Sequence, residues 1–389
     1  MSLLESIRAG RPLRHAGGIA HDSSAPHLAD TLAVSREYDA RVLGANIERW
    51  GDVLAAFTPR TLLVPLTRAH AALLLRAYET LERAESAGVV HAAAAAYIAS
   101  GQTSAPLVPE EEALLAGLGP GIQCAIDALG DGGAGCFVKL SSRSPKDAAV
   151  RSGVFAAHYA QALRREDRDA LDDARRLWIV CEGEGAALRF TDAAAVVRAL
   201  VLSERVWQDM TLALRHPDAW EQNVVLRKWE AVPIDMEFRT FVFNGRMTAI
   251  SQYAYQLCSP RLTDSAQLAR AIAAVRSLFD ALWPVLAEAG FSACVLDFGV
   301  IPPTGAEGAR EWAATLIEIN PFEESTDGGL FSWVRERTLI EGTADDVVYP
   351  VVRVTERTRT GALTMVPRGW KEVMARVERE LAGASGAHE

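Results

Sequence analysis

Two apolar runs in the last third of the chain carry polar residues that could bind a metal ion. In "LIEINPF", the alternation of side chains along a strand should turn Ile317 and Ile319 to the core. Glu318 and Asn320 would then face the open side, and Asp297 lies in "VLDFGV", which we expect to be the adjacent antiparallel strand. Three hard oxygen ligands on one face suit magnesium that also binds substrate phosphates. Each acid alone would more often be a surface charge at a strand end, but the three polar residues together favour a metal site.

Three basic residues lie in strand-like runs of their own. Lys139 stands between Val138 and Leu140 in "FVKL", so it either extends to water or meets an anion. Arg227 and Lys228 are adjacent in "VVLRKWEAV", and alternation places them on opposite faces. Only one of the two can therefore share a face with the target of Lys139. Lysine suits polyphosphate as a point charge, and arginine binds oxygens in pairs.

Two further features are compatible with either a binding or a structural role. Glu237 and Arg239 share one face of a strand, where the simplest interpretation is an ion pair. The loop "SSRSP", which begins at Ser141, could meet phosphate with its hydroxyls and amides or form a plain turn. The sequence contains neither a Walker motif nor GxGxxG, which would have decided the question.

The elements that must position these residues are read from periodicity and from turn residues. Segments with the alternation or apolar density of strands are 60–66, 176–183, 224–232, 236–253, 292–301 and 313–322. The run 236–253 contains Asn244-Gly245, which favours a tight hairpin. Helices are predicted over 67–84 (opened by Thr67), 110–128, 192–215, from Asp264 or Ser265 to Gly290, and 370–381, with a helix fragment and connector over 91–112. Helices segregated around antiparallel hairpins indicate an α+β fold.

Composition limits the class of protein. The 389 residues carry a net charge of −10, which argues against a broad nucleic-acid surface. The five cysteines form no CxxC pair, and we expect them to be reduced thiols in the core. Neither a membrane-spanning apolar run nor a signal peptide is evident, so we expect a cytoplasmic protein without a membrane partner.

Four segments taken together resemble a known family. "FVKLSSRSPKDA", "LRKWEAVPIDMEFRTFVFNGRMTAISQ", "VLDFGV" and "IEINPFEESTDGGLFSW" are similar, in this order, to the successive motifs of the cell division cycle protein 123 family, divergent members of the ATP-grasp superfamily. The resemblance covers roughly residues 46–335. It implies an ATP-grasp fold, in which two α+β lobes clasp ATP, preceded by an N-terminal α/β segment. The implied divisions are 1–45 (a partly ordered arm), 46–118 (N-terminal α/β region), 119–230 (first lobe), 231–345 (second lobe with the metal site) and 346–389 (C-terminal helix and tail).

The resemblance also implies roles for single residues. Lys139 would face the α- and β-phosphates, Arg227, Lys228 and Trp229 would form the hinge, and Lys228 would reach phosphate. The backbone from Trp229 through Glu230 and Val232 would run along the edge of the adenine. Arg239 would lie near the triphosphate, and Ser141 would belong to the phosphate loop. Asp297, Glu318 and Asn320 would be the magnesium ligands. An anion opposite Lys139 would thus explain its place between buried neighbours.

This chain departs from the family pattern at two of these positions. Ser141, Ser142 and Arg143 stand where the family usually has Asn-Trp-Ser, and Glu318 replaces an aspartate. The first departure puts the phosphate-loop contacts in question, whereas glutamate remains an oxygen ligand.

Two functions follow from the resemblance. Eukaryotic relatives are assembly factors for translation initiation factor 2, which predicts an ATP-bound binding module for a protein partner. The Ala- and Arg-rich composition is typical of a bacterial chain, in which that factor is absent, so an enzyme is the first hypothesis. It would be an ATP-dependent ligase that joins a carboxylate to an amine through an acyl-phosphate. Lys139, Lys228, Arg239 and magnesium would neutralise the transferred γ-phosphoryl group, and the acceptor would be a peptide, a protein or a small amine.

Overall fold

The computed structural model describes residues 38–86, 109–130, 133–167, 171–303, 312–358 and 361–385. The chain divides into two compact units, Met1–Arg41 and Val42–Glu389, and the architecture below is that of the second. The predicted N-terminal arm and the predicted 91–112 connector therefore lie mostly outside the described residues. None of the described helices is both long and apolar enough to cross a bilayer.

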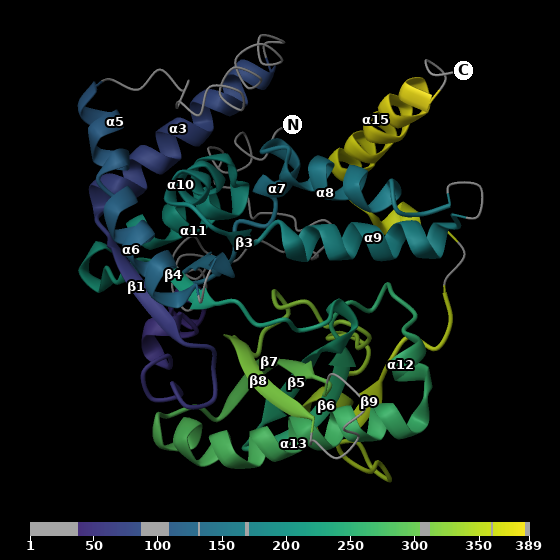
Figure 1. Cartoon of the computed structure of the whole chain (residues 1–389). Helices are drawn as coiled ribbons and strands as arrows, with labels where there is room; N and C mark the ends of the chain where they lie inside the picture. Colours follow the sequence, from purple (N-terminus) through teal and green to yellow (C-terminus); the bar gives the residue numbers. More distant parts are fainter. Residues whose placement is uncertain are drawn as a thin grey trace, which may run out of the picture. The chain divides into compact units, whose positions relative to one another are not determined.

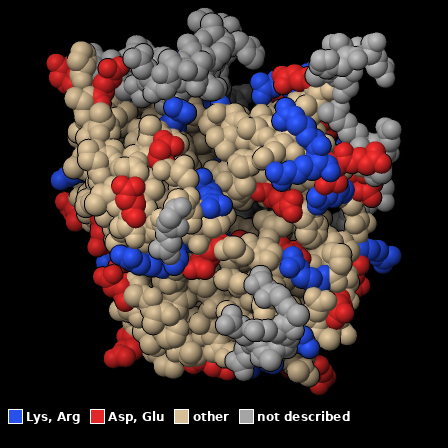
Figure 2. All heavy atoms as spheres, in the orientation of Figure 1, with Lys and Arg blue, Asp and Glu red and all other residues tan. Residues whose placement is uncertain are grey.

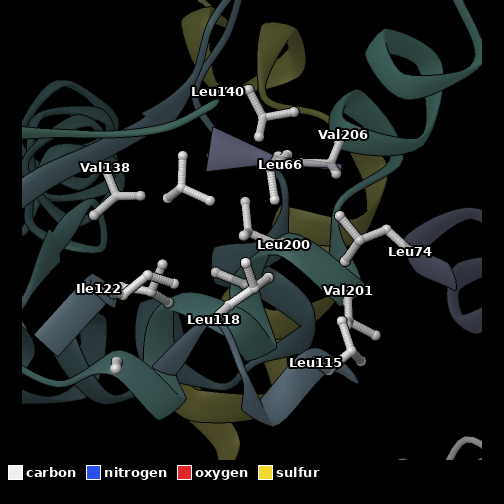
Figure 3. Close-up of a cluster of buried hydrophobic side chains, with 14 of the residues drawn as sticks. Leu66, Leu74, Leu115, Leu118, Ile122, Val138, Leu140, Leu200, Val201 and Val206 are labelled. Carbon is white, nitrogen blue, oxygen red and sulfur yellow. The ribbon is translucent and has the colours of Figure 1, made fainter. Parts of the chain in front are cut away.

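A four-stranded antiparallel sheet organises the first half of the unit. Its order is β1 (Thr61–Leu66), β4 (Gln222–Lys228), β2 (Cys136–Leu140) and β3 (Arg189–Phe190). One face packs against four helices: α3 (Arg68–Ser86), α6 (Gly119–Leu129), α10 (Ala193–Leu202) and α11 (Glu204–Leu214). Figure 3 shows side chains from both sheet and helices meeting in this core.

The alternation of β2 decides which of its side chains reach that core. Cys136, Val138 and Leu140 belong to the core cluster, which leaves Phe137 and Lys139 on the other face. A lysine can therefore lie between two buried neighbours without entering the apolar core.

A five-stranded sheet organises the second half. Its order is β8 (Ala313–Asn320), β7 (Ala293–Ile301), β5 (Glu237–Phe243), β6 (Arg246–Gln252) and β9 (Val351–Arg353), and only the β6–β9 pair is parallel. The predicted hairpin is confirmed, because Asn244 and Gly245 both have positive φ between β5 and β6. Helix α13 (Ser265–Glu288), begun by Asp264 as predicted, packs along one face of this sheet (Figure 1).

The remaining helices complete the unit. They are α5 (Pro109–Ala116), α7 (Ala148–Arg151), α8 (Val154–Leu163), α9 (Asp173–Ala186), α12 (Pro260–Thr263), α14 (Arg337–Glu341) and α15 (Arg368–Ser385), with short 3-10 turns at Ile47–Arg49, Pro217–Ala219, Ile234–Met236 and Ala362–Met365. Helices α8, α9 and α15 share a third apolar cluster.

The predicted α+β class, the helix opened by Thr67 and the C-terminal helix are confirmed. All five cysteines are free, as expected, although Cys124 is exposed.

The predicted strand over 176–183 is wrong, because this segment lies inside helix α9. The side chain of Asp172 accepts a hydrogen bond from the Arg175 amide at 2.8 Å and so begins the helix. Leu177, Val180 and Cys181 are buried at helical spacing. A short apolar run is compatible with either structure, and here the cap decides for the helix.

Two helices predicted as continuous are each divided. The segment 192–215 forms α10 and α11, because Ser203 between them has extended backbone angles and its hydroxyl accepts from the Val206 amide at 3.2 Å. The segment 110–128 forms α5 and α6. At Ser203 an internal cap restarts the hydrogen-bond ladder where apolar periodicity alone shows no break, whereas no side chain caps the start of α6.

Ser203→Ala should destabilise the protein by about 1–3 kcal/mol, because it removes the α11 cap and a buried partner of Asp147. Urea unfolding would measure the loss. Ser152→Ala is the matched control: its hydroxyl makes only two long, local hydrogen bonds, donating to the Ala149 carbonyl at 3.3 Å and accepting from the Val154 amide at 3.4 Å, so a change within roughly 0.5 kcal/mol is expected. Equal midpoints for Ser203→Ala and the wild type would show that the cap contributes nothing.

Candidate functional site

Two adjoining cavities meet at the open face of the four-stranded sheet. The apolar cavity, of about 390 Å³, is lined by residues including Trp229, Val232 and Thr315. The charged cavity, of about 300 Å³, is lined by five acidic and five basic side chains among others. The ten charged residues are Lys139, Lys146, Arg205, Arg227, Arg239, Glu184, Glu237, Asp297, Glu318 and Asp327. Shared walls, among them Phe137, Leu188 and Ile317, join the two cavities into one cleft.

A row of charged side chains crosses the floor of the charged cavity. The strand register places Arg239 of β5 opposite Asp297 of β7, and Asp297 opposite Glu318 of β8. The Arg239 Nε and one terminal nitrogen each donate to an Asp297 carboxylate oxygen at 2.8 Å. Lys139, from the other sheet, completes the row with an ion pair to Glu318. We call these four side chains the charge row.

The acids of the row are held by different neighbours. Asp297 also accepts a 2.9 Å hydrogen bond from the Asn320 amide. Burial raises the pKa of Asp297, while Arg239 acts in the opposite direction. Burial would also raise the pKa of Glu318, but the Lys139 ammonium holds it below its usual value. The three predicted oxygen ligands thus lie together and face the cations predicted opposite them.

A bulge in β8 changes one side-chain prediction. Phe298 pairs with Leu316 and Asp297 pairs with Glu318, so Ile317 is the extra residue between them. Ile319 is buried in the core as expected, whereas Ile317 lines both cavities. The expectation that both isoleucines face the core is therefore wrong, because a bulge breaks strict alternation.

Arg227 holds this bulge and joins the two sheets. Its terminal nitrogens donate to the backbone carbonyls of Leu316 and Ile317 and to the Thr58 hydroxyl. Register places it on the same face as Phe137, next to Lys139, with Lys228 on the opposite face as alternation predicts. Burial lowers the pKa of Arg227 to about 10. Of the adjacent basic pair, Arg227 is therefore the one that shares the face of Lys139.

The predicted hinge residues line the apolar cavity. Lys228 is exposed at its edge, and its backbone amide donates to the Arg60 carbonyl at 2.8 Å. Trp229 lies 5.6 Å from the guanidinium of Arg189, measured to its ring centre. Glu230 and Val232 follow along the same wall.

Gly299 of β7 allows close packing behind this wall. A Cβ atom there would lie 2.7 Å from a methyl group of Val232. Only glycine therefore lets Val232 and Ile317 approach the strand so closely.

Ser141 lies outside the residues that line the two cavities. Its hydroxyl donates to Glu48 at 2.6 Å and accepts from the Asn223 amide at 2.8 Å. Ser142 and Arg143 bind the Asp209 carboxylate of α11. These three positions, where the chain departs from the family pattern, thus tie the loop to its surroundings.

Several residues that line the charged cavity were not singled out from the sequence. They are Ser144, Lys146, Glu184, Arg205, Tyr253, Tyr255, Gln256 and Asp327. Glu184 directly follows the segment 176–183, which was predicted to be a strand and is helical. Arg205 lies in the segment 192–215, which was predicted to be one continuous helix and forms two. Lys146 belongs to the segment "FVKLSSRSPKDA", and its closeness in sequence to the other basic residues of that segment was the signal available.

Charged side chains of both signs are interspersed over the face drawn in Figure 2. This face therefore presents no one-signed patch that would dominate the electrostatics of the cleft.

Glu237 provides a pH test of the cleft. Burial, with a contribution from Asp297, raises its pKa to about 7. A carboxyl whose folded pKa is raised stabilises the protein below its unfolded pKa, and this contribution is lost as pH rises through about 7. Glu237→Gln should therefore be more stable than the wild type at pH 8, by roughly 1–3 kcal/mol, with little difference at pH 4.5.

Urea midpoints measured across this pH range test the prediction. Glu380→Gln, at an exposed position on α15 outside the cleft, serves as the control for loss of one carboxylate. A constant difference between Glu237→Gln and the wild type from pH 4.5 to 8 would contradict the raised pKa.

Comparisons with known proteins agree on one family. A model of the D123 family matches residues 172–370, which is more than half of the chain. The structure of Cdc123 from Schizosaccharomyces pombe is similar, with 20% identity, a TM-score of 0.51, and coverage of 82% of this chain and 97% of that chain. A C-terminally truncated form of the same protein gives 22% identity, a TM-score of 0.49, and coverage of 82% and 98%. No curated protein matches. The family expected from the four sequence segments is confirmed: the chain belongs to the D123 (Cdc123) family.

Proposed function

We propose that the cleft binds ATP with magnesium in an ATP-grasp arrangement, and that the protein is an ATP-dependent ligase that joins a carboxylate to an amine. The observation that carries the proposal is the junction of the two cavities. The apolar cavity offers Trp229, Val232 and Ile317 to a flat base, and the charged cavity offers Lys139 and Arg239 to phosphates. An amphipathic ligand with an aromatic end and an anionic end fits this division.

The residues present fit a magnesium ion that shares its coordination with phosphate. Asp297 and Glu318 supply carboxylates, and Asn320 supplies an amide oxygen on the same face. Within the described residues, no three His, Cys, Asp or Glu side chains are grouped so as to hold a metal ion. Phosphate and water would therefore complete the coordination, which is the usual way proteins hold magnesium.

The charge row supports binding by exchange of partners. Lys139 and Glu318 neutralise each other; Lys139 is buried and Glu318 is partly buried. On binding, Lys139 would exchange Glu318 for a phosphate, while Glu318 would exchange Lys139 for the metal ion. Each charge keeps an opposite charge beside it, so the cost of an unpaired buried charge is avoided.

The chemistry proposed for this site is phosphoryl transfer to a carboxylate. The carboxylate oxygen attacks the γ-phosphorus and ADP leaves; an amine then attacks the acyl-phosphate and releases phosphate. Lys139 and Arg239 line the charged cavity, so they would stabilise the charge on the transferred group. Lys228 lines only the apolar cavity, which gives it a smaller part at the γ-phosphate. The amine would belong to a peptide, a protein or a small molecule.

The contacts between the sheets favour a second candidate, an ATP-bound module that binds a protein partner. Arg227 and Lys139 both connect the two sheets. A nucleotide that enters these contacts would change how the sheets are held, and a partner could recognise that change without turnover.

Asp297→Asn should weaken the binding of ATP in the presence of magnesium by more than about ten-fold, because it removes a metal ligand but keeps an acceptor for Arg239. Calorimetry with and without magnesium measures the effect. Asp280→Asn, at an exposed position on α13, is the control and should bind as the wild type does. The proposal fails if the wild type binds neither ATP nor ADP with magnesium.

Release of ADP and phosphate separates the ligase from the binding module. We expect both products to form when ATP is supplied with a carboxylate pool and an amine pool, and Lys139→Met to abolish their release while the protein remains folded. Tight ATP binding without turnover, together with one protein that co-purifies in stoichiometric amount, would exclude the ligase and support the binding module.

A further inference from the structure

Several residues that line the charged cavity have no role in the proposed nucleotide site. Lys146 comes from the loop between β2 and α7, and Arg205 comes from the first turn of α11. Tyr253, Tyr255 and Gln256 lie in the segment after β6 and line the same cavity. These elements are separate from the strands that carry Arg239, Asp297 and Glu318.

Arg205 is held from one side only. Its Nε donates to the Ser144 carbonyl at 2.9 Å, and its backbone amide donates to Asp147 at 3.2 Å. Asp147 in turn accepts from the Ser203 hydroxyl at 2.6 Å, which fixes the start of α11 against the loop. Across the described residues, the two terminal nitrogens of Arg205 have no protein partner, and no acid forms an ion pair with it. A fixed guanidinium with two donors available is arranged for a bidentate oxyanion.

Lys146 is already partly neutralised. Its ammonium lies 2.9 Å from a carboxylate oxygen of Glu184, which α9 contributes. Tyr253 and Glu184 keep the pKa of Lys146 above its usual value, so it remains charged. Within the described residues, Lys146 pairs with Glu184 and Lys139 pairs with Glu318, whereas Arg205 has no ion-pair partner of its own. One positive charge with a planar pair of donors matches a carboxylate better than a phosphate dianion.

We propose that Arg205, assisted by Lys146, forms a second subsite that binds the carboxylate group of the second substrate. The inference rests on the proposed ligase function and deepens it, because it names the substrate group and the residues that hold it. The subsite opens into the same cavity as Lys139 and Glu318. A carboxylate held there would lie in the cavity that receives the γ-phosphoryl group, as transfer requires.

Propionate is a suitable probe because it carries the carboxylate and little else. Its affinity can be measured on the full chain by ligand-observed NMR with MgADP present, with chloride as the ionic-strength control. Arg205→Gln should weaken propionate binding by about ten- to hundred-fold, as expected for loss of a charged, paired hydrogen bond, and should leave MgATP affinity unchanged. Arg270→Gln removes an arginine from the exposed surface of α13 and should alter neither affinity.

A second variant tests the same subsite in the opposite direction. Glu184→Gln removes the carboxylate that competes for Lys146, so propionate should bind about three-fold more tightly. If Arg205→Gln does not fold, as judged by thermal unfolding, Arg205→Lys keeps the charge without the paired donors and should still weaken propionate binding.

The outcomes separate this inference from the proposed function. Unchanged propionate affinity in the Arg205 and Glu184 variants overturns the subsite. Loss of MgATP but not MgADP affinity in Arg205→Gln also overturns it, because the γ-phosphate would then be the bound oxyanion. Propionate binding is also measured without nucleotide. If the wild type then binds propionate through Arg205 but binds no MgATP, the carboxylate subsite stands and the nucleotide proposal fails.

Discussion

The charge row is the constraint on which the rest of this site depends. Arg239, Asp297, Glu318 and Lys139 are placed in one row by strand register, and three of them are almost entirely removed from water. An isolated charge in such a place costs several kcal/mol, so each must have a partner. Because Lys139 comes from a different sheet, its pairing with Glu318 also sets where the two sheets meet.

Two backbone features make room for the row and for the cleft above it. The bulge at Ile317 turns that side chain to the cleft while it leaves Glu318 opposite Asp297, and Arg227 binds the carbonyls that the bulge exposes. Gly299 lets Val232 pack directly on β7. The apolar and charged cavities therefore adjoin because irregular backbone is stabilised at that point by a buried arginine.

The proposed nucleotide site and the proposed carboxylate subsite differ in how their charges are balanced. Lys139 and Arg239 each have an acid partner that a metal–nucleotide complex can replace, whereas Arg205 has backbone and loop contacts on one side only. Paired charges suit a ligand that brings its own counter-ion, such as a triphosphate with magnesium. An unpaired guanidinium suits a single carboxylate.

Local patterns in the sequence determined the hairpin at Asn244-Gly245, helix α13, the faces of Lys139 and Arg227, and the grouping of Asp297, Glu318 and Asn320. The hairpin, the helix and the two faces follow from periodicity or turn chemistry within a few residues, and the grouping of the three polar residues also needed the expected antiparallel pairing of their strands. Only the tertiary structure decided that 176–183 is helical, that Ser203 divides two helices, that Ile317 forms a bulge, and that Arg205 reaches the cleft. The bulge and the cleft contacts depend on partners far away in the chain, and apolar periodicity carries no information about those partners. The two caps are local, but they act through single side-chain hydrogen bonds that apolar periodicity does not record.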